Sequence, residues 1–200
     1  MPYWIESLIL TFIPLFIVID ALGNLPIVIS LSGNMLREER RKLIHVAIIT
    51  ATLVGLAFLF FGQFILSVMG ISVGAFAIAG GLILLVLSIR YMTTGHMVDV
   101  IKEEIVAVVP IGTPLTVGPA TITTLLLLAT QFPLYMVLIS FILNIIITWL
   151  IFLAGNQIIR FMGRGGLKAV SRVFSLLLAA IAVSMIIHGL DLVGIISVTG

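Results

Sequence analysis

Residues 109–123 read VPIGTPLTVGPATIT and lie in the middle of an uncharged run that extends over residues 105–130. A run of this length can cross a hydrocarbon core of about 30 Å, which takes about 20 helical residues. The stretch also holds three prolines and two glycines. Proline lacks a backbone donor and clashes with the preceding turn, and glycine weakens a helix interior. The stretch therefore predicts a membrane span that is broken near its middle.

The whole chain has the composition of a membrane protein. Of its 200 residues, 62% are hydrophobic and 9% are charged, against about 25% charged in soluble domains. Further runs of span length carry at most one charge and cover residues 7–36, 46–69, 71–89, 132–159 and 173–190. Six transmembrane helices are expected, in a single transmembrane domain over residues 1–200. The chain has no cysteine, which excludes disulfides and thiolate chemistry.

The basic residues predict the orientation of the chain in a cell membrane. Every lysine and arginine lies in or beside the first, third and fifth connections between these spans. Cytoplasmic loops of membrane proteins carry such an excess of positive charge. The pattern places loops 1–2, 3–4 and 5–6 in the cytoplasm and both termini outside. It also explains the net charge of +2 without nucleic acid as a partner.

Two related halves of three spans each are expected at about residues 1–92 and 105–190. Each half opens with a span that contains glycine and proline, and the first of these reads IDALGNLPI at residues 19–27. An odd number of spans per half turns the second copy over relative to the first, which gives the inverted repeat common among transporters. The predicted fold is an all-α membrane protein of two inverted three-helix repeats, with helices one and four broken near mid-membrane.

We expect the breaks near residues 24–26 and 118–119, because Pro26 and Pro119 both suit the first turn of a new half-helix. Asn24 would cap the first half-helix, and Thr116 or Gly118 the second. The backbone N–H groups at such starts suit a carboxylate or another anion, and freed carbonyls suit an ammonium group or a cation. The alternative is that two long helices tilt and are merely kinked by proline.

Three polar positions inside the spans are candidates for function. Asp20 is the only acid well inside a span, where an acid costs about 2.5–3.5 kcal/mol. It is an ion-coupling group, a partner for a substrate amine, or a structural acid that caps the broken helix. Asn144, in the middle of the fifth span, lines the site or only joins two helices. Thr113 and Thr116 lie between the prolines of the fourth span.

Small residues are concentrated in the run SVGAFAIAGG at residues 72–81. Gly70 and Gly74 form a GxxxG spacing, which is typical of closely packed membrane helices. The packing is either within one chain or between the protomers of a homo-oligomer. The three histidines are scattered along the chain, so the sequence indicates no metal site and no cofactor.

Two motifs resemble those of the MarC family of bacterial and archaeal inner-membrane proteins. They are ID-x-x-G-N-x-P at residues 19–26 and P-x-x-x-P-x-x-x-G-P at residues 110–119. The resemblance extends over nearly the whole chain and includes the layout of six spans. It implies a transporter of small neutral amino acids such as glycine and alanine. The positions carried over from the motifs are Asp20, Gly23, Asn24, Pro26, Gly112, Thr113, Pro114, Thr116, Gly118 and Pro119.

The expected function is secondary transport of small neutral amino acids by alternating access, coupled to a gradient of protons or sodium. The two breaks would supply the anion site and the cation site that a small zwitterion needs. The alternative is a transporter or flippase for another small solute, a drug or a lipid-linked substrate. No lysine or arginine lies near either motif, which counts against a phosphate. An enzyme is not expected, because Asp20 has no second acid or histidine near it in sequence.

Overall fold

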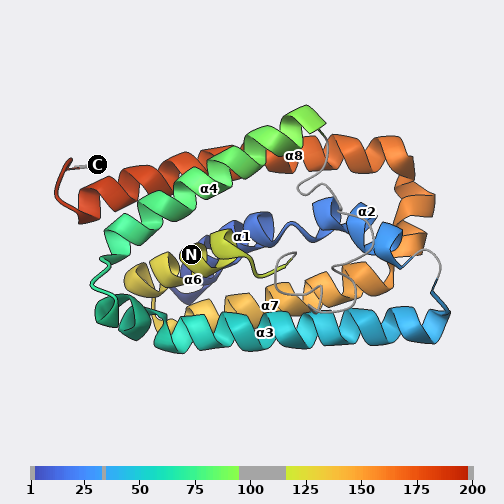
Figure 1. The fold of residues 1–200 in the computed structure, drawn as a ribbon, viewed down its shortest axis with the longest axis horizontal. Helices are drawn as coiled ribbons and strands as arrows, with labels where there is room; N and C mark the ends of the chain where they lie inside the picture. Colours follow the sequence, from blue (N-terminus) through green and yellow to red (C-terminus); the bar gives the residue numbers. More distant parts are fainter. Residues whose placement is uncertain (1–2, 33–34, 95–115, 198–200) are drawn as a thin grey trace.

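A computed structural model of the chain describes residues 3–32, 35–94 and 116–197. Helices make up nearly all of these residues, and most of them run side by side along one long axis (Figure 1). In chain order the helices are α1 (Tyr3–Ile19), α2 (Ala21–Leu31), α3 (Arg37–Val68), α4 (Val73–Thr94), α6 (Pro119–Gln131), α7 (Leu134–Leu153) and α8 (Gly155–Leu192).

Five segments of the described residues have the length and hydropathy of membrane spans. They are Tyr3–Pro26, Arg37–Val68, Val73–Arg90, Leu134–Leu153 and Gly165–Leu192. These segments agree with the predicted all-α membrane fold. Most of the first half of the predicted fourth span lies outside the described residues, and its second half forms the shorter apolar helix α6. The count of six spans and the inverted repeat therefore stay predictions.

Two segments predicted as loops are helical. The basic segment at residues 37–42 forms the first turns of α3, where Glu39 Oε2 accepts a hydrogen bond of 2.9 Å from the backbone N–H of Leu36. The fifth connection, predicted at residues 160–172, lies inside α8, which is kinked at Gly163 with a φ of 67°. The loop prediction was wrong at residues 37–42, because lysine, arginine and glutamate favour the helical conformation about as readily as leucine. At residues 160–172 most of the chain is helical, but the predicted connection contains the turn at Gly163 that separates the two segments of α8.

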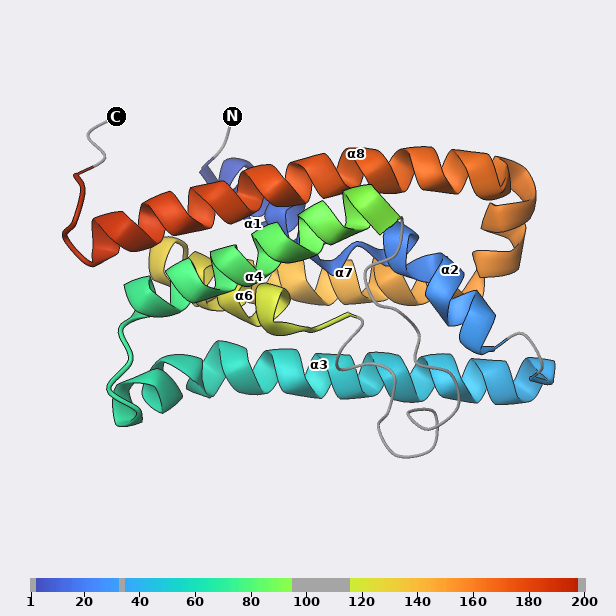
Figure 2. The ribbon, with the colours of Figure 1, turned by 45° about the horizontal axis from the view of Figure 1, so that its top comes forward.

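The connections gather at two opposite ends of the bundle (Figures 1 and 2). One end holds the start of α1, the α3–α4 connection, the α6–α7 connection and the end of α8. The other end holds the α2–α3 connection, the end of α4 and the α7–α8 connection, and Arg37 and Arg160 belong to it. This arrangement of connections is expected of helices that cross a membrane repeatedly.

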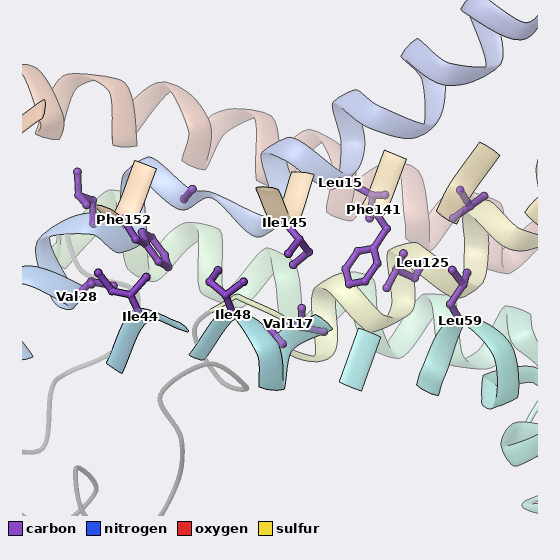
Figure 3. Packing of buried hydrophobic residues seen from close by; sticks show 14 of the residues in the cluster. Leu15, Val28, Ile44, Ile48, Leu59, Val117, Leu125, Phe141, Ile145 and Phe152 are labelled. Carbon is purple, nitrogen blue, oxygen red and sulfur yellow. The ribbon is translucent and has the colours of Figure 1, made fainter. Parts of the chain in front are cut away.

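Two clusters of buried apolar residues hold the helices together. The larger cluster joins α1, α2, α3, α6, α7 and α8, and Figure 3 shows Phe141 and Phe152 of α7 inside it. The second cluster joins α1, α4, α6 and α8 and contains Ile17 and Leu178. Large apolar side chains also point outward, among them Phe64 of α3. Such a surface is unsuited to water and is expected where lipid is the solvent.

Helices α4 and α8 run antiparallel in close contact, which glycine permits. A Cβ added to Gly74 would lie 2.8 Å from the backbone oxygen of Gly189, and a Cβ on Gly189 would lie 2.7 Å from that of Gly74. Gly81 approaches the carbonyl of Ala182 equally closely, at 2.8 Å from its added Cβ. The predicted small-residue packing is thus found within one chain. Gly70 takes no part in it, since it has a φ of 69° in the turn after α3.

Candidate functional site

The first span is interrupted at Asp20, which separates α1 from α2 and has a left-handed backbone conformation with a φ of 42°. Few L residues adopt this conformation, and aspartate and asparagine tolerate it best. The prediction that the first span is broken is therefore confirmed, but the break lies at Asp20 and not at residues 24–26. Pro26 lies inside α2, where it deprives only the carbonyl of Leu22, four residues earlier, of its helical donor.

The two helix ends at this break are capped by side chains from opposite sides of it. Asp20 Oδ1 accepts a hydrogen bond of 3.0 Å from the backbone N–H of Gly23 and so caps the start of α2. Asn24 Nδ2 donates a hydrogen bond of 3.0 Å to the carbonyl of Ile19, the last residue of α1. Asp20 is thus the N-cap, and the prediction that Asn24 fills this position was wrong. The capping role considered for Asp20 is confirmed, and its role in ion coupling stays a prediction.

One oxygen of the Asp20 carboxyl group is left for another partner. Asp20 is 0% exposed, and its Oδ2 has no hydrogen-bond partner among residues 3–32, 35–94 and 116–197. A buried polar atom without a partner is costly, the more so when it is charged. Gly23 and Asn24 are buried beside it. This oxygen is therefore able to receive a proton, a cation or a donor group of a ligand.

The second interruption is the non-helical stretch at residues 116–118, which lies inside the predicted fourth span and directly before α6. Gly118 is the N-cap of α6 and Pro119 its first residue, as the sequence predicted. Thr116 lies in the turn before them and is buried, and its carbonyl accepts a hydrogen bond of 3.1 Å from Thr121 Oγ1. The N-cap makes no side-chain hydrogen bond, so this helix start suits a ligand that accepts hydrogen bonds. The candidate residues outside the described part of the chain are Gly112, Thr113 and Pro114.

Both interruptions border the same part of the core. Ala21, next to Asp20, and Val117, next to Thr116, belong to the larger apolar cluster, and α1 contacts α6. Figure 3 shows Val117 close to the side chains of α3 and α6 that fill this cluster. Both interruptions also lie near the middle of the bundle's length (Figure 2). Two motifs about a hundred residues apart in sequence thus border one buried apolar cluster.

Asn144 joins α7 to α1 rather than to the break. Its Nδ2 donates to the carbonyl of Phe12 at 3.2 Å and to that of Ser140 at 2.9 Å. Phe12 precedes Asp20 by eight residues, which is about 12 Å along a helix. The helix-joining role considered for Asn144 is therefore confirmed. Its Oδ1 is buried without a partner in the described part of the chain, so a ligand-binding role for Asn144 stays a prediction.

The sequence interpretation missed the polar contact that adjoins Asn144. Ser140 Oγ and Thr11 Oγ1 form a buried hydrogen bond of 2.6 Å between α7 and α1. Thr148 continues the row and donates to the carbonyl of Asn144 at 2.8 Å. Ser140, Asn144 and Thr148 repeat at every fourth residue, which places them on one face of a helix. This spacing is the signal that would have revealed a polar stripe on α7.

These helices and their buried interruptions define an all-α integral membrane protein. Residues 5–193 match the model of the MarC family integral membrane proteins, and the chain belongs to this family. The assignment confirms the resemblance found in the two motifs.

The relatives of the chain are membrane proteins of archaea and bacteria. It is 31% identical to a UPF0056 membrane protein of Methanocaldococcus jannaschii, in an alignment that covers 93% of this chain and 97% of that protein. It is 32% identical to a UPF0056 membrane protein of Pyrococcus abyssi, over 93% of this chain and 95% of the relative. It is also 32% identical to the UPF0056 inner membrane protein YhgN of Escherichia coli, over 88% and 92%. No solved structure matches the chain.

Proposed function

We propose that this protein is a secondary transporter of small neutral amino acids, of the glycine and alanine type, that works by alternating access under an ion gradient. The observation that carries the proposal is that two helix interruptions border the same buried apolar cluster. Non-helical backbone at membrane depth is tolerated only inside protein or beside a water-filled cavity, and transporters build their substrate sites from it. The substrate class is the one that the family resemblance implies.

The chemistry of the two interruptions suits a small zwitterion. Asp20 Oδ2, which lacks a partner among the described residues, suits the ammonium group. The start of α6 at Gly118 suits the carboxylate, because a helix N-terminus offers backbone N–H groups and the positive end of the helix dipole. Leu25 and Val117 belong to the two motifs and are buried, and we expect such apolar neighbours to favour a substrate with a small side chain.

The packing of the helices supports two inverted halves. Helix α2 packs against α7 and α8, and α6 packs against α3 and α4. In an inverted repeat, α2, α3 and α4 of the first half would correspond to α6, α7 and α8 of the second. The contacts of α2 with α7 and α8 are then matched by the contacts of α6 with α3 and α4. In addition, α3 contacts α7 and α4 contacts α8, so each contacts its own counterpart. An alternating-access mechanism would rock these halves about the region of the two interruptions.

The direct test is uptake of labelled glycine and alanine by proteoliposomes that hold the purified protein. We expect uptake above that of empty vesicles under an imposed proton or sodium gradient, and none of labelled tryptophan, whose side chain is too large. Absence of glycine and alanine flux under both gradients would contradict the proposal. Flux of a drug or of a lipid-linked phosphate in the same vesicles would instead favour the alternative class of substrate.

Asp20→Asn tests the coupling group. Asparagine keeps an oxygen for the N–H of Gly23 and tolerates a positive φ, so the break is preserved while the charge is lost. We expect the variant to equilibrate glycine without concentrating it. Asp191→Asn, which removes an acid near the end of α8, is the matched control and should concentrate glycine like the unmodified protein. Accumulation by Asp20→Asn against the glycine gradient would show that another group couples transport to the ion.

A further inference from the structure

A cavity of about 620 Å³ opens at the end of the bundle that carries the arginines. It lies between the first turns of α3, the last turn of α7 and the first turns of α8. Arg37, Arg40, Arg41 and Arg160 line it, together with His45 and Trp149, and none of its ten described lining residues is acidic. In the sequence these arginines indicate the orientation of the chain, and their convergence on one cavity is a property of the fold.

Two donors of the lining residues are buried without acceptors. Arg40 Nη2 and Trp149 Nε1 have no hydrogen-bond partner in the described part of the chain. The guanidinium group is permanently charged, and the indole N–H can only donate. Leaving such donors unpaired is costly, and more so for the charged one. The partner that these two donors require carries negative charge and only accepts hydrogen bonds. Because both atoms are shielded from solvent, a ligand in the cavity would first meet the exposed Arg160 and then reach them through small shifts of the side chains.

The fold holds these donors in place. A Cβ added to Gly155 would lie 3.1 Å from Arg40 Nη2 and 2.7 Å from Leu25 Cδ1, so the guanidinium group packs against bare backbone at the α7–α8 junction. The ring of His45 lies 5.6 Å from that of Trp149, between centroids, and its Nδ1 lies 2.7 Å from the carbonyl oxygen of Arg41. One wall of the cavity is therefore built from side chains with fixed contacts rather than from arginines free in solvent.

We propose that this cavity binds a phosphate group, presented either by an anionic lipid headgroup or as free phosphate. The planar fork of arginine matches the oxygens of phosphate in pairs, and four such side chains surround a volume within the usual range of about 300–1,000 Å³ for small-ligand sites. The site lies at one end of the bundle, whereas the interruptions at Asp20 and Gly118 lie near its middle. It is thus a second site, and it does not rest on the proposed transport of amino acids.

Two arms of one experiment distinguish the sources of phosphate. In the first, the thermal unfolding of the detergent-solubilised protein is followed with inorganic phosphate and with chloride at equal ionic strength. In the second, native mass spectrometry counts phosphatidylglycerol and phosphatidylcholine retained from mixed nanodiscs. Stabilisation by phosphate alone identifies free phosphate as the ligand. Preferential retention of phosphatidylglycerol identifies an anionic headgroup. No stabilisation and no preference overturns the proposal.

Arginine variants test whether the stabilisation by phosphate or the retention of phosphatidylglycerol arises from binding in this cavity. Arg160 is exposed on the first segment of α8, so Arg160→Gln leaves the packing intact and should weaken binding about tenfold. Arg40→Gln removes the buried donor and should weaken it at least as much. Arg172→Gln, on the same helix but outside the cavity lining, is the matched control and should bind like the unmodified protein. Equal losses in Arg160→Gln and Arg172→Gln, or full binding without Arg40 and Arg160, would overturn the site.

Discussion

At the scale of single residues, Asp20 both forms and stabilises the interruption of the first span. A left-handed backbone costs most L residues roughly 1–2 kcal/mol, and aspartate is among the few side chains that visit it routinely. Its carboxyl oxygen then caps α2 through the N–H of Gly23, while Asn24 caps the end of α1 from the other side. The motif D-x-x-G-N at residues 20–24 therefore supplies both caps, so that α1 ends directly before Asp20 and α2 begins directly after it.

Two substitutions of Asp20 separate capping from charge. Asp20→Ala removes the cap and places a residue that disfavours a positive φ, so we expect the free energy of unfolding to fall by about 1–3 kcal/mol. Asp20→Asn keeps both the oxygen and the backbone preference and should stay close to the unmodified protein. SDS-induced unfolding in mixed micelles, followed by circular dichroism, measures both. Equal losses in the two variants would show that the negative charge, rather than the cap, stabilises the break.

At the scale of helices, the sequence predicted that two spans are broken; the break of the first span is confirmed at another position, and for the fourth span the predicted start of the second half-helix is confirmed. Pro119 marks the start of α6 because proline lacks only an N–H that a first turn does not use. By the same reasoning Pro26 was predicted to start a half-helix, which was wrong. It lies inside α2, where a proline leaves one carbonyl without its donor but does not end the helix. The break occurs instead where caps form on both sides, at Asp20. Capping of this kind depends on where the side chains lie, and a hydropathy pattern does not predict that.

The contact between α4 and α8 gives a prediction at this scale. The added methyl group in Gly189→Ala would meet the backbone of Gly74, which cannot rotate away, so the two helices must separate. We expect a loss of about 1–3 kcal/mol in the free energy of unfolding. Gly165→Ala is the matched control in the same helix, because an added Cβ there has no described neighbour within 4 Å. It should be neutral or should stabilise by up to about 1 kcal/mol through helix propensity. Equal effects of the two variants would contradict close packing of α4 on α8.

At the scale of the whole molecule, the sequence indicated the spans and the basic end, but not the contacts made between distant segments. The bond between Thr11 and Ser140 joins residues 129 positions apart. The spacing on α7 indicates a polar stripe, but it does not say which helix this stripe meets. The close approach of Arg40 to Gly155 cannot be predicted from the sequence either, because it depends on a glycine that has no side chain. Such sites form only when the helices pack, so the sequence supplied candidates for the central site and nothing for the cavity at the basic end.

The arrangement of the connections predicts which parts of the molecule are reached from outside the cell. Ser72, between α3 and α4, and Gln157, in the first segment of α8, are exposed at opposite ends of the bundle. The chain has no cysteine, so Ser72→Cys and Gln157→Cys each introduce a single thiol. Because basic connections stay in the cytoplasm, we expect a membrane-impermeant maleimide to label Ser72→Cys in intact cells, and Gln157→Cys only after the cells are permeabilised. Labelling of Gln157→Cys in intact cells, with Ser72→Cys protected, would reverse the orientation and place the arginine-lined cavity on the outer face.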